Sequence, residues 1–264
     1  MSILRRYYAQ TEQKMKPSIS IILITKNSEK TVEKCLESIQ WANEIIVLDS
    51  GSTDQTLSIC LKYTDHVFQT DWPGFGIQKN RALAKATSNW VFSIDSDEWI
   101  TDALREEMIK TIKNPTALVF QLPRLNQYCG QWIRHGDVGK DKVTRLFKRG
   151  FAHFSDDRVH EKIMTSEKIG KLTFPLCHNT YDSIDALLQR MNLYSSLSAK
   201  MRFDRGKKTN LLKAIISACW SFTRAYFFRA GFLDGKMGFI VCAAAAQSSY
   251  YRHVKLMELM KQRC

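Results

Sequence analysis

The sequence lacks any CxxC cysteine pair and contains little glycine or proline. Its 264 residues include seven Cys, 12 Gly and 5 Pro. An odd and dilute set of cysteines does not build a disulfide framework and is typical of a reducing cytosol. With 44% hydrophobic and 25% charged residues, the composition excludes collagen-like, low-complexity and wholly disordered chains. A folded chain of one large domain, or of a catalytic domain with an added module, is expected.

Long hydrophobic runs are also absent. The longest one is FIVCAAAA, residues 239–246, and the chain begins with the polar and basic stretch MSILRRYYAQTEQKMKP. A membrane-spanning helix needs about 20 apolar residues, and a secretory signal needs an apolar core. The sequence therefore predicts a cytoplasmic protein without a membrane span.

Positive charge is concentrated towards the C-terminus. The net charge is +13, and residues 201–264 hold 12 Lys and Arg against 3 Asp and Glu. In this part, LLKAIISACWSFTRAYFFRAGF, residues 211–232, joins apolar and aromatic residues with Lys and Arg, as membrane-interface helices do. Two interpretations stay open: these helices contact an anionic membrane surface, or their apolar faces pack on the rest of the chain.

Short β-branched runs alternate with helical patterns over the first hundred residues. Strands are expected at residues 18–25, 44–48, 66–69 and 90–94, and helices at 31–39, 54–62 and 76–86. Because the strands are apolar on both faces, the sequence predicts an α/β fold with a mostly parallel central sheet, covered on both sides. Leu57 and Leu61 are expected to face the core.

After residue 115 the pattern becomes rich in strands and loops, and then helical. Helices are expected at residues 183–202, 210–229 and 236–260, the first with apolar residues at helical spacing. We divide the chain into an N-terminal extension (1–17), a donor-binding half (18–115), an acceptor-binding and catalytic half (116–182) and a basic, helical C-terminal extension (183–264).

Polar and acidic residues follow three of the expected parallel strands. The first strand ends in TKN, residues 25–27, the second in DSGSTD, residues 49–54, and the fourth in DSDE, residues 95–98. In an open parallel sheet, ligands bind beyond the carboxyl ends of the strands. Two carboxylates at positions i and i+2 can coordinate Mg²⁺ or Mn²⁺, and the cation can in turn bind a diphosphate. The ordinary alternative is a set of capped turns, since Ser, Thr and Asp are natural helix caps.

Four sequence blocks then point to one family. SIILITKN, EIIVLDSGSTDQT, GFGIQKNRAL and WVFSIDSDEWI follow one another within residues 18–100. In this order they resemble the family 2 glycosyltransferases of the A-type (GT-A) fold. RLFKRG, RVHEKI and the GFLDG region extend the resemblance to bacterial lipopolysaccharide core glycosyltransferases, which add a hexose, usually glucose, to heptose.

The resemblance implies a binding site for the nucleotide-sugar donor. Asp49 would accept a hydrogen bond from the uracil of a UDP-sugar, with Thr25 and Asn27 in the same pocket. Lys79 would lie near the diphosphate, and Asp95 would contact the ribose or the metal.

The resemblance also implies a divalent metal, Mg²⁺ or Mn²⁺. Asp97 would bind it directly, and His178 would be an additional ligand of the metal or the diphosphate. The structural alternative for His178 is a hydrogen-bonded histidine without a ligand role.

An inverting transfer needs a base that takes the proton of the acceptor hydroxyl. Glu161 lies where the family carries its acceptor-side acid, and Asp156 and Asp157 are the alternatives, because this sequence has His-Glu where many relatives have Glu-Asp. A surface charge pair of Glu161 with Lys162 is the structural alternative. The residues Trp132, Arg134 and Asp137 could line the acceptor pocket or lie in an exposed loop.

We therefore predict an inverting, metal-dependent enzyme that transfers a hexose, with glucose the expected case, from a UDP-sugar to a heptose of the lipopolysaccharide inner core. Its partners would be the UDP-sugar, the lipid-linked saccharide acceptor (lipid A-core) and the anionic inner face of the inner membrane, with no nucleic acid. One alternative is a family 2 enzyme acting on another cell-surface glycan. The others are a nucleotidylyltransferase, which usually has a glycine-rich phosphate loop that SIILITKNSEKTVEK lacks, and a non-enzymatic basic binding module.

Overall fold

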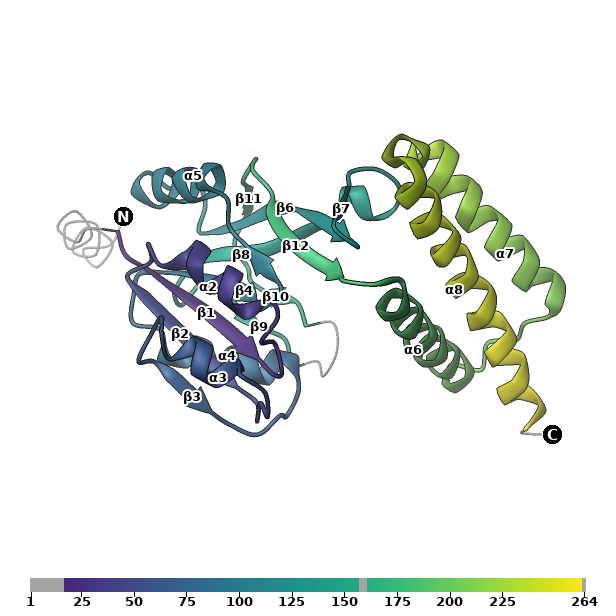
Figure 1. Ribbon diagram of the computed structural model, residues 1–264, viewed down its shortest axis with the longest axis horizontal. Coiled ribbons are helices and arrows are strands. Elements are labelled where there is room, and N and C mark those ends of the chain that lie inside the picture. Colours follow the sequence, from purple (N-terminus) through teal and green to yellow (C-terminus); the bar gives the residue numbers. More distant parts are fainter. Residues whose placement is uncertain (1–16, 157–160, 263–264) are drawn as a thin grey trace. The chain divides into compact units, whose positions relative to one another are not determined.

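The computed structural model describes residues 17–156 and 161–262 (Figure 1). Within these ranges the chain forms two compact units. The first unit comprises residues up to 123 together with residues 142–176, and the second comprises residues 124–141 together with the chain from residue 177 onwards.

The first unit is built on a sheet with the strand order β3-β2-β1-β4-β8-β6. The four N-terminal strands run parallel to one another: β1 (Ile19–Thr25), β2 (Glu44–Asp49), β3 (Val67–Gln69) and β4 (Trp90–Asp95). The next two are antiparallel to their neighbours: β8 (Lys142–Lys148) and β6 (Val119–Tyr128), whose second half continues into the second unit. The predicted α/β fold with a mostly parallel central sheet is confirmed.

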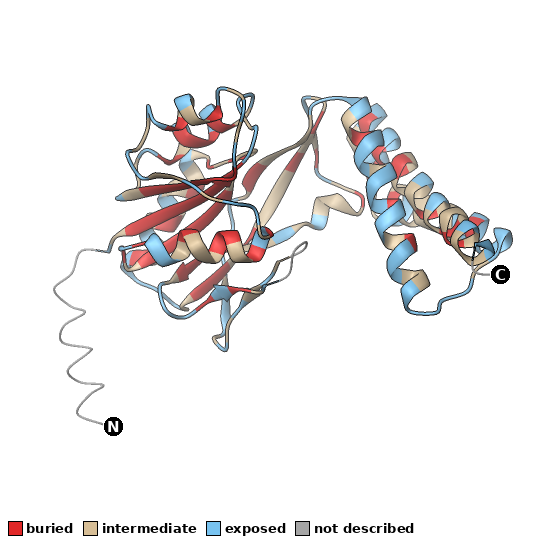
Figure 2. Ribbon diagram, turned by 90° about the horizontal axis from the view of Figure 1, so that it is seen from below, coloured by how far each residue is buried: buried red, intermediate tan, exposed pale blue. Residues whose placement is uncertain are grey.

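Alternate side chains of β1 enter two separate cores, as expected for a strand that is buried on both faces. Ile21 and Leu23 pack with α2 (Val32–Ile39) and α5 (Asp102–Lys113). Ile22 and Ile24 pack with α4 (Phe75–Lys85) on the other face. Figure 2 shows the buried central strands in red between these layers of helices.

The helix expected at residues 54–62 is shorter than predicted. It spans Thr56–Cys60 (α3), with Thr56 and Cys60 as its buried residues. Leu61 lies beyond the helix end and is 58% exposed, so its expected inward position is wrong. Four short strands complete the first unit: β5 (Glu98–Trp99), β9 (His153–Phe154), β10 (Ile163–Met164) and β11 (Ile169–Lys171).

The second unit joins a small β structure to three helices. β7 (Gln131–Ile133) pairs with the second half of β6, and the chain also forms β12 (Leu176–Tyr181) and the 3₁₀ turn η1 (Val138–Lys140). The helices are α6 (Ile184–Asp204), α7 (Leu211–Thr223) and α8 (Gly235–Lys261), with a π-helical turn η2 (Arg224–Phe228) and a 3₁₀ turn η3 (Gly231–Asp234) between the last two.

The starts of α6 and α7 follow from their capping residues. The side chain of Ser183 accepts a hydrogen bond from the N–H of Ala186, and that of Asn210 accepts one from the N–H of Lys213. Ser and Asn at these positions satisfy backbone donors that have no partner inside the helix. The predicted helix starts at residues 183 and 210 agree with these caps to within one residue.

Burial in α6 differs from what its sequence pattern suggests. Leu188, Tyr194 and Leu197 follow a helical period but are exposed, whereas Ser195 and Ala199 are buried. Small residues let a neighbouring helix approach closely, and Lys255 of α8 reaches the Ser195 hydroxyl at 2.8 Å. Among the described helices, none combines the length and the apolar character needed to cross a bilayer.

Candidate functional site

The parallel register brings three strand ends side by side. Thr25 at the end of β1 pairs with Asp49 at the end of β2, and Asp95 at the end of β4 pairs with Ile24. The sheet is extended from β1 in both directions, by β2 on one side and β4 on the other. This is the switch point at which open α/β sheets bind ligands.

A buried lysine joins two of the predicted carboxylates at this edge. Lys79 belongs to α4 and is only 1% exposed. Its ammonium nitrogen lies 2.8 Å from Oδ1 of Asp95 and 2.7 Å from Oε1 of Glu161. The structure therefore brings together the residues expected near the diphosphate, at the end of β4 and on the acceptor side.

A second buried cation holds the other oxygen of Asp95. Nη2 of Arg145 lies 2.5 Å from Oδ2 of Asp95 and 2.9 Å from Oε1 of Glu98. Oε2 of Glu98 accepts the backbone N–H of Asp95 at 3.0 Å. Both Arg145 and Glu98 are buried. Arg145, Glu98 and Lys79 together fix the position of the Asp95 carboxylate.

Neither Arg145 nor Glu98 was predicted as a site residue. Arg145 stands in KVTRLFK, directly before the buried Leu146 and Phe147, and Glu98 stands directly before Trp99. Charged side chains are rarely buried unless they are paired. A charged residue directly before apolar residues was therefore the signal, but the identity of its partners follows only from the fold.

The neighbouring charges keep Asp95 and Arg145 ionised. Burial raises the pKa of the Asp95 carboxyl, but the positive charges of Arg145 and Lys79 outweigh it and hold that pKa well below its usual range. Burial likewise lowers the pKa of Arg145, and the charges of Asp95 and Glu98 outweigh it, so that the pKa is raised. The cluster is a set of mutually compensated charges.

Asp49 shapes the loop that follows β2. Its side chain is buried, and its Oδ2 accepts the N–H groups of Gly51 and Ser52, each at 2.9 Å. The hydroxyl of Ser52 donates to Oδ1. These contacts are those of a capped turn, the ordinary alternative for this motif. Recognition of uracil by Asp49 stays a prediction.

Asn27 ties the loop after β1 to the loop after β2. Its backbone is left-handed, with φ +49°, a conformation that Asn tolerates better than most residues. Its Oδ1 accepts the N–H of Thr53 at 2.8 Å, and its own N–H donates to Oγ of Ser52 at 2.8 Å. The two loops therefore form one wall of the strand-end site.

Thr25 carries a polar atom without a partner. The residue is 3% exposed, and among the described residues its hydroxyl oxygen has no hydrogen-bond partner. A buried hydroxyl without a hydrogen bond costs free energy, so native proteins rarely leave one unsatisfied. Its place at the end of β1 fits a group that bonds to a ligand.

The oxygen donors at this edge fit a hard divalent cation. Asp97 lies half-buried in the turn between β4 and β5, where the Ser96 hydroxyl lies 2.9 Å from Oγ of Ser28. Both oxygens of Asp95 contact cations, and the role of Asp97 as a direct metal ligand stays a prediction. Across the described residues no group of three or more His, Cys, Asp or Glu is arranged to hold an ion. Mg²⁺ commonly uses only one or two carboxylates, with substrate phosphates and water completing its shell.

His178 belongs to the second unit, where it lies on β12. Its Nδ1 lies 2.7 Å from Oδ1 of Asn126 and 3.2 Å from the hydroxyl of Thr180. These contacts match the structural alternative for this residue, and its role as a ligand stays a prediction.

The remaining acceptor-side candidates have different surroundings. Asp156 is exposed, and Asp157 lies outside the described residues. In the second unit, Asp137 forms ion pairs of 2.6 Å with both Arg224 and Arg229. The loop that was expected to line an acceptor pocket is therefore fixed to the helices of its own unit.

Comparison with known proteins identifies the family. Residues 20–173 match Glycosyl transferase family 2. The chain is 30% identical over 254 residues to the uncharacterized glycosyltransferase RP128 of Rickettsia prowazekii (strain Madrid E). This match covers 91% of this chain and 87% of the relative. It is 29% identical over 250 residues to the lipopolysaccharide core biosynthesis glycosyltransferase LpsC of Rhizobium meliloti (strain 1021), covering 89% of this chain and 93% of the relative.

Among solved structures, that of S. aureus TarS 1-349 in complex with UDP aligns with 94% of this chain and 92% of its own, with a TM-score of 0.48 and 17% identity. The family match spans more than half of the chain, the first unit has the expected α/β sheet, and the relatives match over nearly the whole length. The chain therefore belongs to glycosyl transferase family 2 and has a GT-A-like fold.

Proposed function

We propose that this glycosyltransferase is an inverting enzyme that transfers a hexose, with glucose the expected case, from a UDP-sugar to a heptose of the lipopolysaccharide inner core. The observation that carries the proposal is the buried Lys79, which joins Asp95 at a strand end to Glu161. In this arrangement the ammonium group of Lys79 forms ion pairs with both a donor-side carboxylate and the candidate base. The name of the relative LpsC, a lipopolysaccharide core biosynthesis glycosyltransferase, supports the choice of acceptor.

In this proposal Glu161 is the general base. Its carboxylate takes the proton of the acceptor hydroxyl while that oxygen attacks the anomeric carbon from the face opposite the diphosphate. The new glycosidic bond forms as the bond from the anomeric carbon to the diphosphate breaks, and UDP leaves. A positioned base contributes about 10² to 10⁴ to the rate. Lys79 holds Oε1 of Glu161 in place at 2.7 Å.

On the donor side, different residues around the strand ends would bind the nucleotide, the diphosphate and the metal. The hydroxyl of Thr25 and the loops held by Asn27 and Asp49 would bind the nucleotide, and the positive charge of Lys79 suits the diphosphate. Asp97 would hold Mg²⁺ or Mn²⁺, with His178 as the predicted additional ligand. A bound metal would offset the negative charge that develops on the departing diphosphate.

The acceptor in this proposal is the lipid-linked saccharide lipid A-core. Such an acceptor is anchored in a bilayer, so the reaction would take place at the anionic inner face of the inner membrane. The basic C-terminal third of the sequence fits this location, because Lys and Arg are attracted to anionic lipids. The second candidate is transfer to another cell-surface glycan, which the same donor site would support.

The test is a panel of UDP-sugars with Mn²⁺ or Mg²⁺. We expect transfer from UDP-glucose to truncated core acceptors that end in heptose, with the anomeric configuration inverted when the product is analysed by NMR. Transfer only to a different glycan would favour the second candidate. Calorimetry that detects no UDP binding by the folded protein, with and without Mn²⁺, would overturn the proposal.

A further inference from the structure

Helix α7 is packed with its small residues inward. Ala214 is fully buried, and the hydroxyl of Ser217 lies 2.7 Å from that of Ser249 on α8. Ala218 and Ser221 share this side of the helix at helical spacing and are half-buried. A surface helix of a water-soluble protein normally does the reverse and turns its large apolar residues inward.

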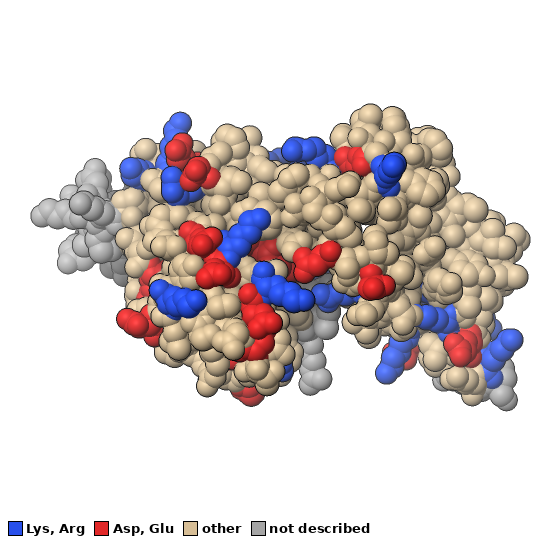
Figure 3. Space-filling view, in the orientation of Figure 1, with Lys and Arg blue, Asp and Glu red and all other residues tan. Residues whose placement is uncertain are grey.

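The large apolar residues of α7 point outward. Leu212, Ile216 and Trp220 are spaced four residues apart, so they form one row, and each is more than half exposed. The row continues into the turn between α7 and α8 through residues that are also more than half exposed: Phe227, Phe228 and Leu233. In Figure 3 the middle part of α7 and α8 shows few charged side chains, and the charged side chains of this region gather towards the ends of the helices. An apolar surface of this extent on one helix normally marks an interaction site.

The segment that carries this row contains only positive charges. Residues 205–233 hold six Lys and Arg and no Asp or Glu. Lys207 and Lys208 are exposed just before α7, and Lys213 is exposed in its first turn. We infer that the outward face of α7, defined by Leu212, Ile216 and Trp220, lies in the interfacial layer of an anionic lipid bilayer, with the exposed aromatic turn beside it. Apolar and aromatic residues enter such a layer while Lys side chains meet the head groups.

Charge complementarity favours a bilayer over a second copy of this chain. A symmetric dimer through α7 would use the same patch on both copies, so it would bury two positively charged patches against each other. Residues 205–233 contain no acidic residue; Asp137 compensates Arg224 and Arg229, and Lys207, Lys208 and Lys213 provide the positive charge of this face. Anionic head groups provide the opposite charge and the apolar layer at once.

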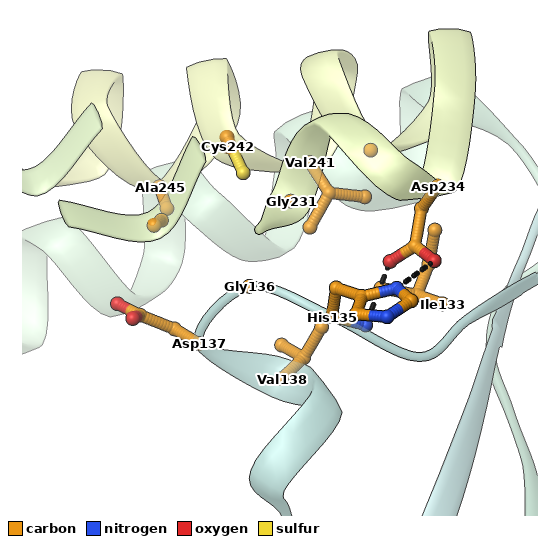
Figure 4. Close-up of a pocket in the computed structure, with 12 residues that line it drawn as sticks. Ile133, His135, Gly136, Asp137, Val138, Gly231, Asp234, Val241, Cys242 and Ala245 are labelled. Carbon is orange, nitrogen blue, oxygen red and sulfur yellow. Dashed lines mark hydrogen bonds and ion pairs between the residues drawn. The ribbon is translucent and has the colours of Figure 1, made fainter. Parts of the chain in front are cut away.

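The turn between α7 and α8, which carries Phe227, Phe228 and Leu233, contacts the loop of the same unit that holds Arg134 and Asp137. This loop is the one that was expected to line the acceptor pocket. Asp234 accepts the N–H groups of Arg134 and His135 at 3.1 and 2.8 Å and lies 2.8 Å from the His135 ring, as Figure 4 shows for the ring contact. Asp137 binds Arg224 and Arg229, which belong to the same turn. If this turn lies at the membrane surface, the loop bound to it is also held close to the bilayer, where a lipid-linked acceptor is anchored. Only this last step rests on the proposed function.

Vesicle binding tests the inference with the full chain. We expect the protein to cosediment with vesicles that contain phosphatidylglycerol more strongly than with pure phosphatidylcholine vesicles, and salt should weaken the binding. The double variant Ile216→Ser, Trp220→Ser should bind at least about tenfold more weakly, because it removes the apolar contact. The triple variant Lys207→Gln, Lys208→Gln, Lys213→Gln should lose the preference for anionic vesicles.

Leu61→Ser is the matched control, since Leu61 is equally exposed but lies in the first unit; it should bind like the wild type. Unchanged binding of the double variant, or no binding by the wild type, would overturn the inference. So would a stable dimer in sedimentation that the double variant dissociates. Transfer to a lipid-free saccharide should be the same in the double variant and the wild type. If the wild type binds vesicles but transfers no sugar, the proposed function fails and the membrane surface stands.

Discussion

The ammonium nitrogen of Lys79 lies 2.7 Å from Oε1 of Glu161, although 82 residues separate them in the sequence. The same nitrogen contacts Asp95 at 2.8 Å. The side chain that links them is buried, so the link is part of the protein core and not a solvated surface pair. A candidate base and a strand-end carboxylate are therefore held in fixed positions by one lysine.

Glu161→Gln should remove most of the turnover while UDP binding is retained. Gln keeps the shape of the side chain and its contact with Lys79 but cannot take the acceptor proton. We expect kcat to fall by about 10² to 10⁴, measured as hexose transfer, with the affinity for UDP followed by calorimetry. Asp156→Asn is the matched control, and its kcat should stay near that of the wild type. If Asp156→Asn loses the turnover and Glu161→Gln does not, the base is Asp156.

The strand ends were predictable from sequence because each one is determined by residues that are neighbours in the chain. A β-branched run followed by polar residues and a helical pattern predicts a parallel strand, and parallel strands meet at one edge of the sheet. Thr25, Asp49 and Asp95 follow directly from this. The position of Glu161 beside Lys79 depends on the path of the chain after β9, and its expected acceptor-side role came from resemblance alone.

The rest depends on tertiary packing. Arg145 binds Asp95 and Glu98 across about 50 residues, and no local pattern names its partners. The outward row of α7 was also not predictable in detail, because its periodic apolar residues fit a core helix equally well. Only the small residues on the side that faces α8 show which side is inward.

Arg145→Met should destabilise the first unit strongly near neutral pH. The variant leaves Glu98 buried without its cation, and breaking a buried ion pair costs about 3–5 kcal/mol. We expect this loss in the free energy of unfolding measured in urea. The control Arg81→Met removes an exposed pair with Asp71, and its effect should stay below about 1 kcal/mol.

The effect of Arg145→Met should also depend on pH in a defined direction. The pKa of Asp95 is depressed in the folded protein, so its ionised form stabilises the fold above the unfolded pKa of about 3.9. That contribution is lost as the pH falls below this value towards the folded pKa. The difference in unfolding free energy between wild type and Arg145→Met should therefore shrink from pH 7 to pH 3. A difference that grows on acidification would contradict the charge assignment.

Asp97→Asn should weaken metal binding without weakening the fold. Asp97 lies half-buried in a turn, and Asn keeps its size but removes the charge that a divalent cation requires. We expect kcat to fall on the order of a hundredfold and the binding of Mn²⁺ in the presence of UDP to weaken. Ser96→Ala, in the same turn, should leave Mn²⁺ binding unchanged. Full Mn²⁺ binding by Asp97→Asn, measured by electron paramagnetic resonance, would remove Asp97 from the metal site.

Thr25→Val should have opposite effects on stability and on nucleotide binding. The Thr25 hydroxyl is buried without a hydrogen bond among the described residues, and Val replaces it with a methyl group of similar size. Because an unsatisfied buried hydroxyl costs about 1–3 kcal/mol, the free energy of unfolding of the ligand-free protein should rise by about 1 kcal/mol. If that hydroxyl bonds to the nucleotide, the Kd for UDP should rise about tenfold.

Ser93→Ala provides the control for this pair of measurements. The Ser93 hydroxyl is also buried and lacks a partner within the described ranges, but it lies inside β4 and not at a strand end. Its removal should raise the stability in the same way and leave the Kd for UDP unchanged. Equal UDP binding by wild type, Ser93→Ala and Thr25→Val would show that the Thr25 hydroxyl has no part in the donor site, whereas weaker binding in Thr25→Val alone would assign the end of β1 to the nucleotide.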